Sequence, residues 1–492
     1  MNSPVLSFLQ SVIQIDRFSS IPIYLQITQQ IIQCIQVKSL TTGNKLPGSR
    51  LLANNLNVNR NTIVAAYNEL DLQGWIKIEP NKGAFVLEYS KNKSIESVNI
   101  KNVSKKFCLK SNFLFKQNRL TESPYKKSTA LYQLTDGIAD ARLYPMKDIA
   151  KWYAYALKNF NKISSLNNKA EENNFNSQLT NYLNLTRNLK IEPSNLVTTQ
   201  NFETCLYIIS QLLFEKNDIV LVAEKNHYKA NMIIQNTGAK LIEIPIDNEG
   251  IVVDFVRKHF LKSSIKAIYI NSQRNYPSTI TLSAKRRIEL LEIAKEYNFL
   301  IIEENADFDI EFQPSNVLPM ASFNTEGNLI YLGKFAQLFS SAFELGFIVA
   351  PTDFINKIKD YIEMLSLSKD LLTQYTLESM LKEGEIHRLQ KKMNLTYKQR
   401  RDFFYNQLKQ KFNDEIECVV PSGGMAFWIE FKNKISLKKL SDIALSNNLY
   451  IPLYIMYQQK DICALRIGFA NFSTTEIEEI INILHKSYLD CK

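Results

Sequence analysis

Three consecutive residues, Arg60, Asn61 and Thr62, place a cation, an amide and a hydroxyl side by side. Side chains of these types bind phosphates and the edges of bases in nucleic acids. They fall at the start of a predicted helix, where the helix dipole and free backbone N–H groups also favour anions. Such a helix can enter the major groove of DNA. An ordinary surface helix with a polar first turn has the same pattern, so the neighbouring elements must decide between the two.

The helix that positions these residues has a predicted start and a predicted stop. Asn59 is a good N-cap, because its side-chain oxygen can accept a free backbone N–H of the first turn. Gly74 stands where the stop of this helix belongs. Between them one apolar stripe repeats at spacings of three and four residues: Ile63, Ala66, Tyr67 and Leu70.

Two further helices and a hairpin surround this helix in the predicted head of the chain. Residues 21–38 carry a helical apolar stripe, and Ser49 is expected to cap a second helix. Two short strands with a turn between them follow at residues 75–87. Three helices and a hairpin predict a winged helix-turn-helix domain over residues 20–87.

This region resembles the N-terminal domain of the GntR family of transcription regulators. The resemblance rests on the stretches PIYLQI, G-x-K-LPGSR-x-LA, L-x-V-x-RNT-x-x-x-AY-x-x-L, GW and KGAFV, in that order. The residues for which it implies contacts with DNA are Arg50, Arg60, Asn61 and Thr62. It also implies that the wing, at Lys82 and Gly83, reaches a phosphate or the minor groove. A double-stranded DNA operator is therefore the expected partner of the head.

The positive charge of the chain is concentrated in its first 130 residues. The formal net charge is +10. Residues 1–86 hold seven Lys or Arg and four Asp or Glu, residues 87–130 hold ten and three, and the remaining charges balance. Basic charge beside a helix-turn-helix fits binding to a polyanion. Residues 88–130, rich in Lys, Ser and Asn, are predicted to form a polar linker, whose basic charge either helps to bind the polyanion or is merely solvated.

Composition limits the remaining classes of protein. A chain of 492 residues, 45% hydrophobic and 22% charged, fits a soluble protein of two or three domains. It has no apolar run long enough to span a membrane and no signal-peptide pattern, so a cytoplasmic protein without a membrane partner is expected. The six cysteines and four histidines are scattered, which predicts neither a disulfide framework nor a metal site.

From residue 131 onward, short apolar runs alternate with helical patterns. Seven such runs predict an α/β domain with a seven-stranded mixed, mostly parallel sheet in a large subdomain at residues 195–350. The expected strands begin near Leu196, Ile219, Lys240, Ala267, Phe299, Leu329 and Phe347. Residues 131–194 and 371–492 are assigned to a smaller α+β subdomain.

Residues 131–492 resemble the aminotransferase-like domain of fold type I pyridoxal-phosphate enzymes. The stretches that carry the resemblance include DGIADARLYPMKDIAKW, QLLFEKNDIVLVAEKNHY, SQRNYPST, FLIIEENADFDIEF, LIYLGKF and LRIGFA. Joined to a GntR-type head, such a domain is similar to the MocR-type regulators. This resemblance implies pyridoxal 5'-phosphate as the family's cofactor. It also implies a homodimer, since fold type I sites usually lie at a dimer interface.

Several positions that hold this cofactor in the family carry other residues here. Gln337 occupies the position of the lysine that forms the Schiff base, and Lys334 that of a phosphate-contacting Thr or Ser. Glu344 replaces the arginine that pairs with the phosphate, and a carboxylate would repel that group. Asn201 and Phe202 replace a glycine and a Ser or Thr at the start of the phosphate-binding helix.

Other positions keep the type of residue that the family uses. Glu304 aligns with the aspartate that holds the pyridine nitrogen, and Tyr228 with the ring that stacks on the cofactor. Tyr276 matches an aromatic residue followed by proline, and Arg466 an arginine that grips a substrate carboxylate. Core packing of Tyr228 and a structural ion pair of Arg466 are the alternatives. The predicted effector pocket consists of Tyr228, Tyr276, Glu304, Lys334, Gln337 and Arg466.

The sequence therefore predicts a DNA-binding transcription regulator without catalytic residues. Its aminotransferase-like domain is expected to serve in dimerisation, either as a sensor of a small-molecule effector or as a scaffold that binds none. Covalent binding of pyridoxal phosphate is not expected, whereas non-covalent binding in the same cleft stays open. One alternative is a working pyridoxal-phosphate regulator or aminotransferase, which the fold alone would suggest. Another is a structural protein whose basic head binds polyanions without sequence preference.

Overall fold

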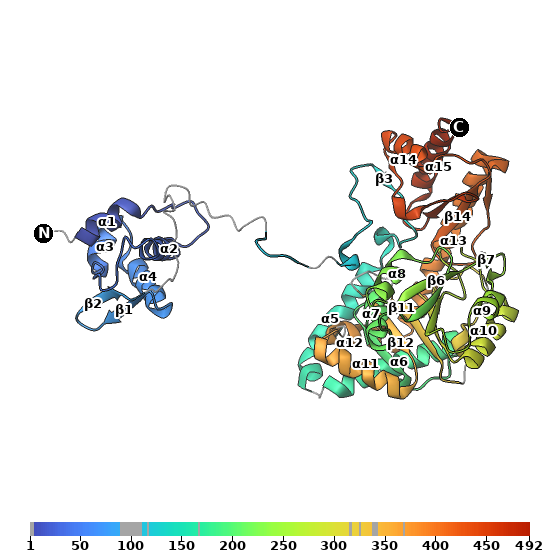
Figure 1. Ribbon diagram of the computed structural model, residues 1–492, viewed down its shortest axis with the longest axis horizontal. Helices are drawn as coiled ribbons and strands as arrows, with labels where there is room; N and C mark the ends of the chain where they lie inside the picture. The colour runs from blue at the N-terminus through green and yellow to red at the C-terminus, as the bar shows by residue number, and fades with distance from the viewer. Residues whose placement is uncertain are drawn as a thin grey trace. The chain divides into compact units, whose positions relative to one another are not determined.

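Two compact units make up the chain in the computed structural model, and each is described by itself (Figure 1). They span Met1–Phe115 and Lys116–Lys492. The structure describes residues 4–88, 111–115, 118–165, 168–313, 317–323, 326–336, 343–367 and 370–492. Most of the predicted linker at residues 88–130 and the position of Gln337 lie outside the described residues.

The first unit contains a winged helix-turn-helix, as predicted. Its elements are α1 (Pro4–Val12), α2 (Ile23–Gln36), α3 (Ser49–Leu56), α4 (Arg60–Leu72), β1 (Ile76–Glu79) and β2 (Gly83–Val86). The two strands pair antiparallel, with Ile76 opposite Val86. The Asn59 side chain caps α4 as predicted, because it accepts the backbone N–H of Asn61 at 2.9 Å. The first turn of α4 therefore holds the polar side chains that the sequence singled out.

The predicted cap of α3 is wrong. Gly48, not Ser49, occupies the N-cap position, and no side chain among the described residues caps this helix. The hydroxyl of Tyr67 in α4 donates a hydrogen bond to the carbonyl of Pro47 at 2.7 Å. This contact fixes the turn before α3 from outside the helix, so Ser49 becomes the first helical residue rather than the cap.

Helix α1 belongs to the core of the head, although it lies before the predicted start of the domain. Leu6, Leu9 and Ile13 are buried among the apolar residues of α2, α3 and α4. The backbone of Gln14, just after α1, makes two hydrogen bonds with the side chain of Gln30 in α2. The Gln30 amide donates to the Gln14 carbonyl at 2.8 Å, and the Gln14 N–H donates to the Gln30 side-chain oxygen at 2.8 Å. The extra helix therefore enlarges the hydrophobic core beneath the helix-turn-helix.

A seven-stranded sheet forms the centre of the second unit, as predicted. Its order is β4-β12-β11-β10-β9-β5-β6, and within it β12 runs antiparallel to both of its neighbours. The strands are β4 (Leu196–Thr199), β5 (Ile219–Ala223), β6 (Lys240–Ile244), β9 (Ala267–Ile270), β10 (Leu300–Asn305), β11 (Leu329–Phe335) and β12 (Leu345–Val349). Parallel strands that are buried on both faces have nearly continuous apolar sequences. For this reason the apolar runs located the strands correctly.

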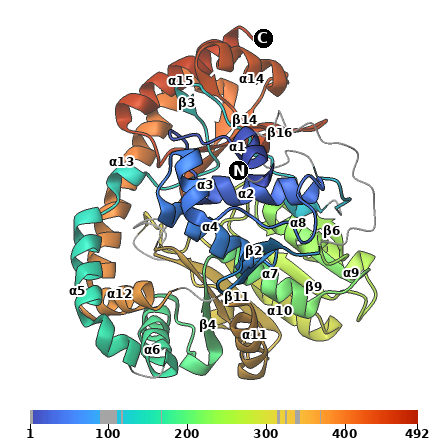
Figure 2. The ribbon, with the colours of Figure 1, turned by 90° about the vertical axis from the view of Figure 1, so that its left-hand side faces the viewer.

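Helices cover both faces of this sheet. One face packs on α7 (Phe202–Leu213), α8 (Tyr228–Gln235) and α11 (Thr352–Leu365). The other packs on α6 (Asn168–Arg187), α9 (Asp254–His259), α10 (Ala284–Tyr297), α12 (Leu371–Lys382) and α13 (Glu385–Phe412). Helices α5 (Met146–Ser165), α6 and α12 pack together at one side of the unit (Figure 2). None of the helices that the structure describes is long and apolar enough to cross a lipid bilayer.

The C-terminal part of the unit adds a smaller antiparallel sheet. Its strands, in spatial order, are β13 (Ile416–Cys418), β14 (Ala426–Phe431), β17 (Cys463–Gly468) and β16 (Met456–Gln458). Helices α14 (Leu437–Ser446) and α15 (Thr474–Leu489) accompany them. Strand β3 (Tyr132–Gln133) pairs in parallel with β15 (Leu449–Tyr450), so the start of the second unit is joined to its C-terminal part.

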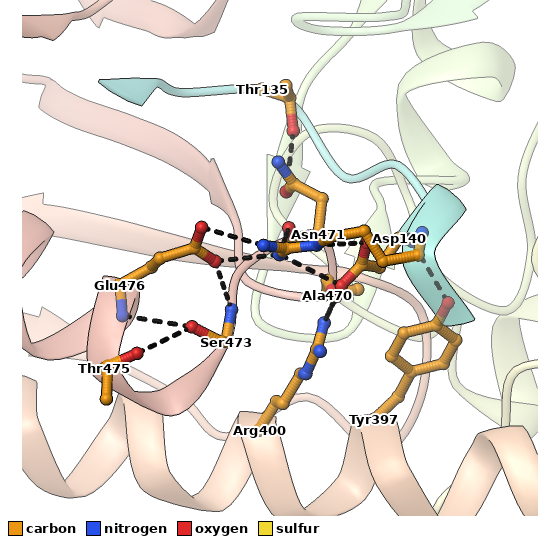
Figure 3. A network of polar contacts seen from close by, with 10 residues as sticks. Thr135, Asp140, Tyr397, Arg400, Ala470, Asn471, Ser473, Thr475 and Glu476 are labelled. Atoms are coloured by element: carbon orange, nitrogen blue, oxygen red, sulfur yellow. Dashed lines mark hydrogen bonds and ion pairs between the residues drawn. The ribbon is translucent and has the colours of Figure 1, made fainter. Parts of the chain in front are cut away.

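Figure 3 shows a polar network that ties the segment after β3 to α13 and α15. The guanidinium of Arg142 contacts the carboxylates of Glu476 and Asp140 at 2.8 and 2.9 Å. Arg400 of α13 donates to the other oxygen of Asp140 at 2.8 Å. Glu476 also accepts the backbone N–H of Ser473, which completes a capping box at the start of α15. Hydrogen bonds from Arg142 lower the pKa of Glu476 to about 2.

Replacing Glu476 with glutamine is expected to lower the free energy of unfolding by about 1 kcal/mol at neutral pH. The amide oxygen can still accept from Ser473, so the change removes the charge and one of the two acceptors that Glu476 offers to Arg142. Since the folded-state pKa is depressed, this stabilisation is present above the unfolded pKa of about 4.3 and is lost as pH falls toward 2.

Urea unfolding of the full chain at pH 7 and pH 3 measures this effect. Glu478→Gln, an exposed carboxylate on the same helix, is the control and should change stability at neither pH. Equal losses in the two variants would contradict the role given to the Arg142 pair.

Candidate nucleic-acid interface and cofactor cleft

The head presents two unpaired arginines next to the polar first turn of α4. Arg50 on α3 and Arg60 on α4 are exposed, and neither guanidinium has a partner among the described residues. Asn61 is also exposed, and Thr62 is half-buried beside it. An unpaired guanidinium has five N–H donors available to a phosphate or a guanine edge. The arrangement is thus able to bind DNA, while the contacts themselves stay predictions.

The wing turn between β1 and β2 brings a further cation into the head surface. The Lys82 ammonium lies 3.3 Å from the Glu79 carboxylate, in an exposed pair that is weak in water. Gly83 has φ +114, a backbone conformation that favours glycine, and a Cβ there would also press on the movable Cε of Lys45 at 3.0 Å. Lys45 was missed as a site residue, although it stands inside the GntR-like stretch G-x-K-LPGSR. It places a second ammonium beside the wing, next to the Phe85 ring.

In the second unit, three aromatic rings and an arginine line up at the predicted effector pocket. Tyr228 opens α8 and stacks on His227, with ring centroids 5.0 Å apart. His227 meets the edge of Tyr276 at 4.7 Å, and the Arg466 guanidinium lies 4.6 Å from the centre of the Tyr276 ring. The structure thus brings Tyr228, Tyr276 and Arg466 together through His227. Sequence reasoning did not give His227 a role, and only its position before Tyr228 could have signalled one.

Arg466 is held by the protein's own backbone. It is 7% exposed, and it donates to the carbonyls of Asp136 and Pro277 at 3.0 and 2.8 Å. Burial alone would raise the pKa of the Asp136 carboxyl. The hydrogen bond with His227 and the charge of Arg466 together outweigh burial, so the pKa is below its ordinary value. A substrate carboxylate would therefore meet a negative charge beside this arginine.

The groups that the sequence aligns with the family's phosphate site bind one another in this protein. Asn201 caps α7 by accepting the Thr204 N–H at 2.9 Å, which satisfies one donor that an anion would use. Glu203 stands in the first turn of α7 and pairs with Lys229 at 3.0 Å. The Lys334 ammonium lies 3.4 Å from the Glu344 carboxylate. A phosphate placed here would face two carboxylates as well as two cations.

The charge state of Lys334 follows from these neighbours. Burial lowers its pKa, but Glu344 and Glu203 raise it more, so the ammonium stays protonated. The Lys334 and Glu344 side chains are 23% and 19% exposed, so the pair is poorly solvated. A protonated, paired lysine is a poor nucleophile, because its nitrogen has no free electron pair. This geometry therefore supports neither a bound cofactor nor a role for Lys334 in place of the family's Schiff-base lysine.

Glu304 lies near His227 and Lys334, whose charges act on it, but it has a partner already. It accepts a hydrogen bond from the hydroxyl of Tyr269, a buried residue of β9 that sequence reasoning missed. Burial raises the pKa of Glu304 above its ordinary value, although the charges of His227 and Lys334 oppose this effect. A carboxyl with a raised pKa is a weaker partner for a pyridinium N–H than an ionised aspartate. Among the described residues, no group of His, Cys, Asp or Glu could hold a metal ion.

Two family models match this chain. Aminotransferase class I and II matches residues 145–484, and the bacterial regulatory proteins of the gntR family match residues 23–86. The chain belongs to the aminotransferase class I and II family. Together with the gntR-type head it has the MocR-type architecture, which confirms the predicted fold class and resemblance.

Relatives with the same two-part arrangement span nearly the whole chain. The HTH-type transcriptional regulator YdfD of Bacillus subtilis is 24% identical over 468 residues, which cover 94% of this chain and 95% of the relative. The probable rhizopine catabolism regulatory protein MocR of Rhizobium meliloti is 20% identical over 483 residues, which cover 96% of this chain and 95% of the relative. The kynurenine aminotransferase of Pyrococcus horikoshii has a similar fold, with a TM-score of 0.67 and 20% identity over 74% of this chain and 92% of its own.

The family's cofactor is pyridoxal phosphate, and the described residues do not fit it. The helix start that would hold the phosphate is capped by Asn201, and the nearby cations are paired with Glu203 and Glu344. Tyr228 and Glu304, which the sequence aligns with residues that contact the ring, do not by themselves anchor the group. The roles of the individual pocket residues stay predictions.

Proposed function

We propose that this protein is a DNA-binding transcription regulator of the GntR and MocR type. The observation that carries the proposal is a contrast between the two units. Arg50 and Arg60 on the head are exposed and lack partners among the described residues, whereas Lys334 and Lys229 in the second unit are paired with carboxylates. Of these four cations, the two that are available to an anion are thus on the head. The names of the full-length relatives support the same function.

The head has the elements that a groove-binding mechanism needs. Helix α4 enters the major groove, and its first turn brings Arg60 and Asn61 to base edges, with Thr62 on the backbone. Arg50 at the start of α3 binds a phosphate, and Lys82 in the wing binds another. The aminotransferase-like unit joins two copies into a homodimer, so that two heads meet paired half-sites on the operator.

Mapping the bound DNA across the genome tests this proposal. We expect a small set of sites with two half-sites separated by whole turns of the double helix, about 10 base pairs each. Sedimentation of the free protein should show a dimer. Binding spread evenly over all sequences would contradict the proposal and favour a polyanion-binding protein without sequence preference.

We also propose that the protein has no transaminase activity and forms no covalent link with pyridoxal phosphate. Borohydride reduction after incubation with the cofactor should leave no pyridoxyl-lysine, as measured by mass spectrometry. Gln337→Lys alone should not restore the link, because Glu203 and Glu344 still repel the phosphate. An adduct on Lys334 would contradict this account and favour a working pyridoxal-phosphate regulator. An active fold type I aminotransferase, treated in parallel, is the positive control.

A further inference from the structure

A cavity of about 660 Å³ opens beside Tyr228, on the outer side of α8. Its walls come from three parts of the second unit. These are α8, the short helix η6 (Leu453–Ile455) with β16, and the segment that follows the short helix η1 (Arg119–Thr121). Cavities of about 300–1,000 Å³ suit small molecules. The cavity is therefore large enough for an effector.

Aromatic rings and thioethers make up the apolar walls of this cavity. The lining includes Tyr228, Tyr454, Tyr457, Met232 and Met456. Aromatic faces carry a negative quadrupole that attracts cations, and thioethers adapt to flat apolar groups. Such walls favour a ligand with a flat body and a positive charge.

Glu122 supplies the charge in this cavity. Among the described residues that line it, Glu122 is the one that is charged at neutral pH. The nearby Lys229 ammonium is paired with Glu203 at 3.0 Å and lies 5.4 Å from the centre of the Tyr125 ring. The lining amide of Asn226 donates to Asn231 at 2.8 Å. A negative ligand would thus meet Glu122 with no free cation among the lining residues.

The wall that holds Glu122 belongs to the stretch of chain that leads from the head into the second unit. Tyr125, three residues on, packs edge-on against Tyr228 and Tyr454, with ring centroids 5.9 and 4.9 Å away. These contacts hold the segment against α8 and η6. A ligand bound between Glu122 and α8 would add contacts to this segment and shift its equilibrium toward the docked form.

We infer that this cavity binds a small organic cation with a flat apolar body, and that the bound cation fixes the segment at residues 119–125. Glu122 provides the counter-charge, and the rings of Tyr228 and Tyr454 provide the stacking surface. The second half of the inference rests on the proposed function, because it makes this segment the route by which the cavity influences the head.

Three matched probes test the site in calorimetry with the full chain and no DNA. Tryptamine is a flat cation, indole-3-acetate its anionic counterpart and 3-methylindole the neutral body. We expect tryptamine to bind best, and Glu122→Gln to weaken it by about tenfold, the loss of roughly 1.4 kcal/mol. Tyr454→Ala should weaken tryptamine and 3-methylindole alike. Glu215→Gln, an exposed carboxylate elsewhere in the unit, is the matched control and should change nothing.

The outcomes separate the site from the proposed function. Three results would each overturn the cation site. They are equal affinity for tryptamine and indole-3-acetate, unchanged tryptamine affinity in Glu122→Gln, and no binding of tryptamine at about 1 mM. Operator affinity is then measured with and without tryptamine. A change in the wild type that is absent in Glu122→Gln supports the route through residues 119–125. Binding of tryptamine without any change in operator affinity overturns that route. If neither the wild type nor Glu122→Gln binds the operator, with or without tryptamine, the result counts against the proposed function instead.

Discussion

Replacing Arg60 with alanine is expected to weaken binding to the operator by about 10- to 100-fold, at a fixed salt concentration. Arg60 is exposed, has no partner among the described residues, and stands in the first turn of α4 beside Asn61. Its removal from the free protein therefore breaks no ion pair and should leave the fold intact. A guanidinium that reaches a guanine edge contributes about 1–3 kcal/mol of discrimination.

Comparison of operator DNA with random DNA makes this prediction specific. Loss on the operator, with little loss on random DNA, supports base readout by Arg60. Asn61→Ala should behave in the same way. Lys158→Ala removes one exposed positive charge from the second unit and is the charge-matched control. Equal losses on both kinds of DNA would instead favour a head that binds polyanions without reading sequence.

Replacing Lys334 with methionine is expected to lower the free energy of unfolding of the second unit by about 3 kcal/mol. The Lys334 ammonium lies 3.4 Å from the Glu344 carboxylate, and the charge of Glu203 also stabilises it. Without the ammonium, the poorly solvated Glu344 carboxylate loses this ion pair, while Glu203 keeps its pair with Lys229. The partial exposure of the pair places the loss at the lower end of the range for buried ion pairs.

A double-mutant cycle isolates the interaction. The variant with both Lys334→Met and Glu344→Met should recover much of the stability, because no unpaired charge from that pair remains. Lys285→Met is the matched control. Its ammonium lies 3.7 Å from Glu289 in a pair on α10 where the lysine is 82% exposed, so the expected loss is below about 0.5 kcal/mol. A similar loss of stability in Lys334→Met and Lys285→Met would contradict the structural role of Lys334.

These two predictions concern opposite uses of positive charge in one chain. In the head, Arg50 and Arg60 have no partner among the described residues and are free to bind an anion. In the second unit, Lys334 and Arg466 are committed to Glu344 and to backbone carbonyls. The same aminotransferase fold can therefore hold its cations in contacts within the protein, because a fold does not fix what its charged groups bind.

Local sequence patterns were sufficient for the helix-turn-helix and the seven strands, whereas the replacement of the Schiff-base lysine by Gln337 stays a prediction. Each depends on residues close together in the chain. Asn59 caps α4 through a neighbour two residues away, and the apolar runs of the sheet need only a strand's length to be recognised.

Tertiary structure alone decided how distant residues share charge and space. The cap of α3 moved to Gly48 because Tyr67 binds the turn before it. Glu304 meets Tyr269, and Arg466 meets the carbonyl of Asp136, at separations of 35 and 330 residues. No local periodicity encodes such contacts, because the packing of whole elements brings them together. The sequence therefore determined which groups the protein has, and the fold determined which of them remain free.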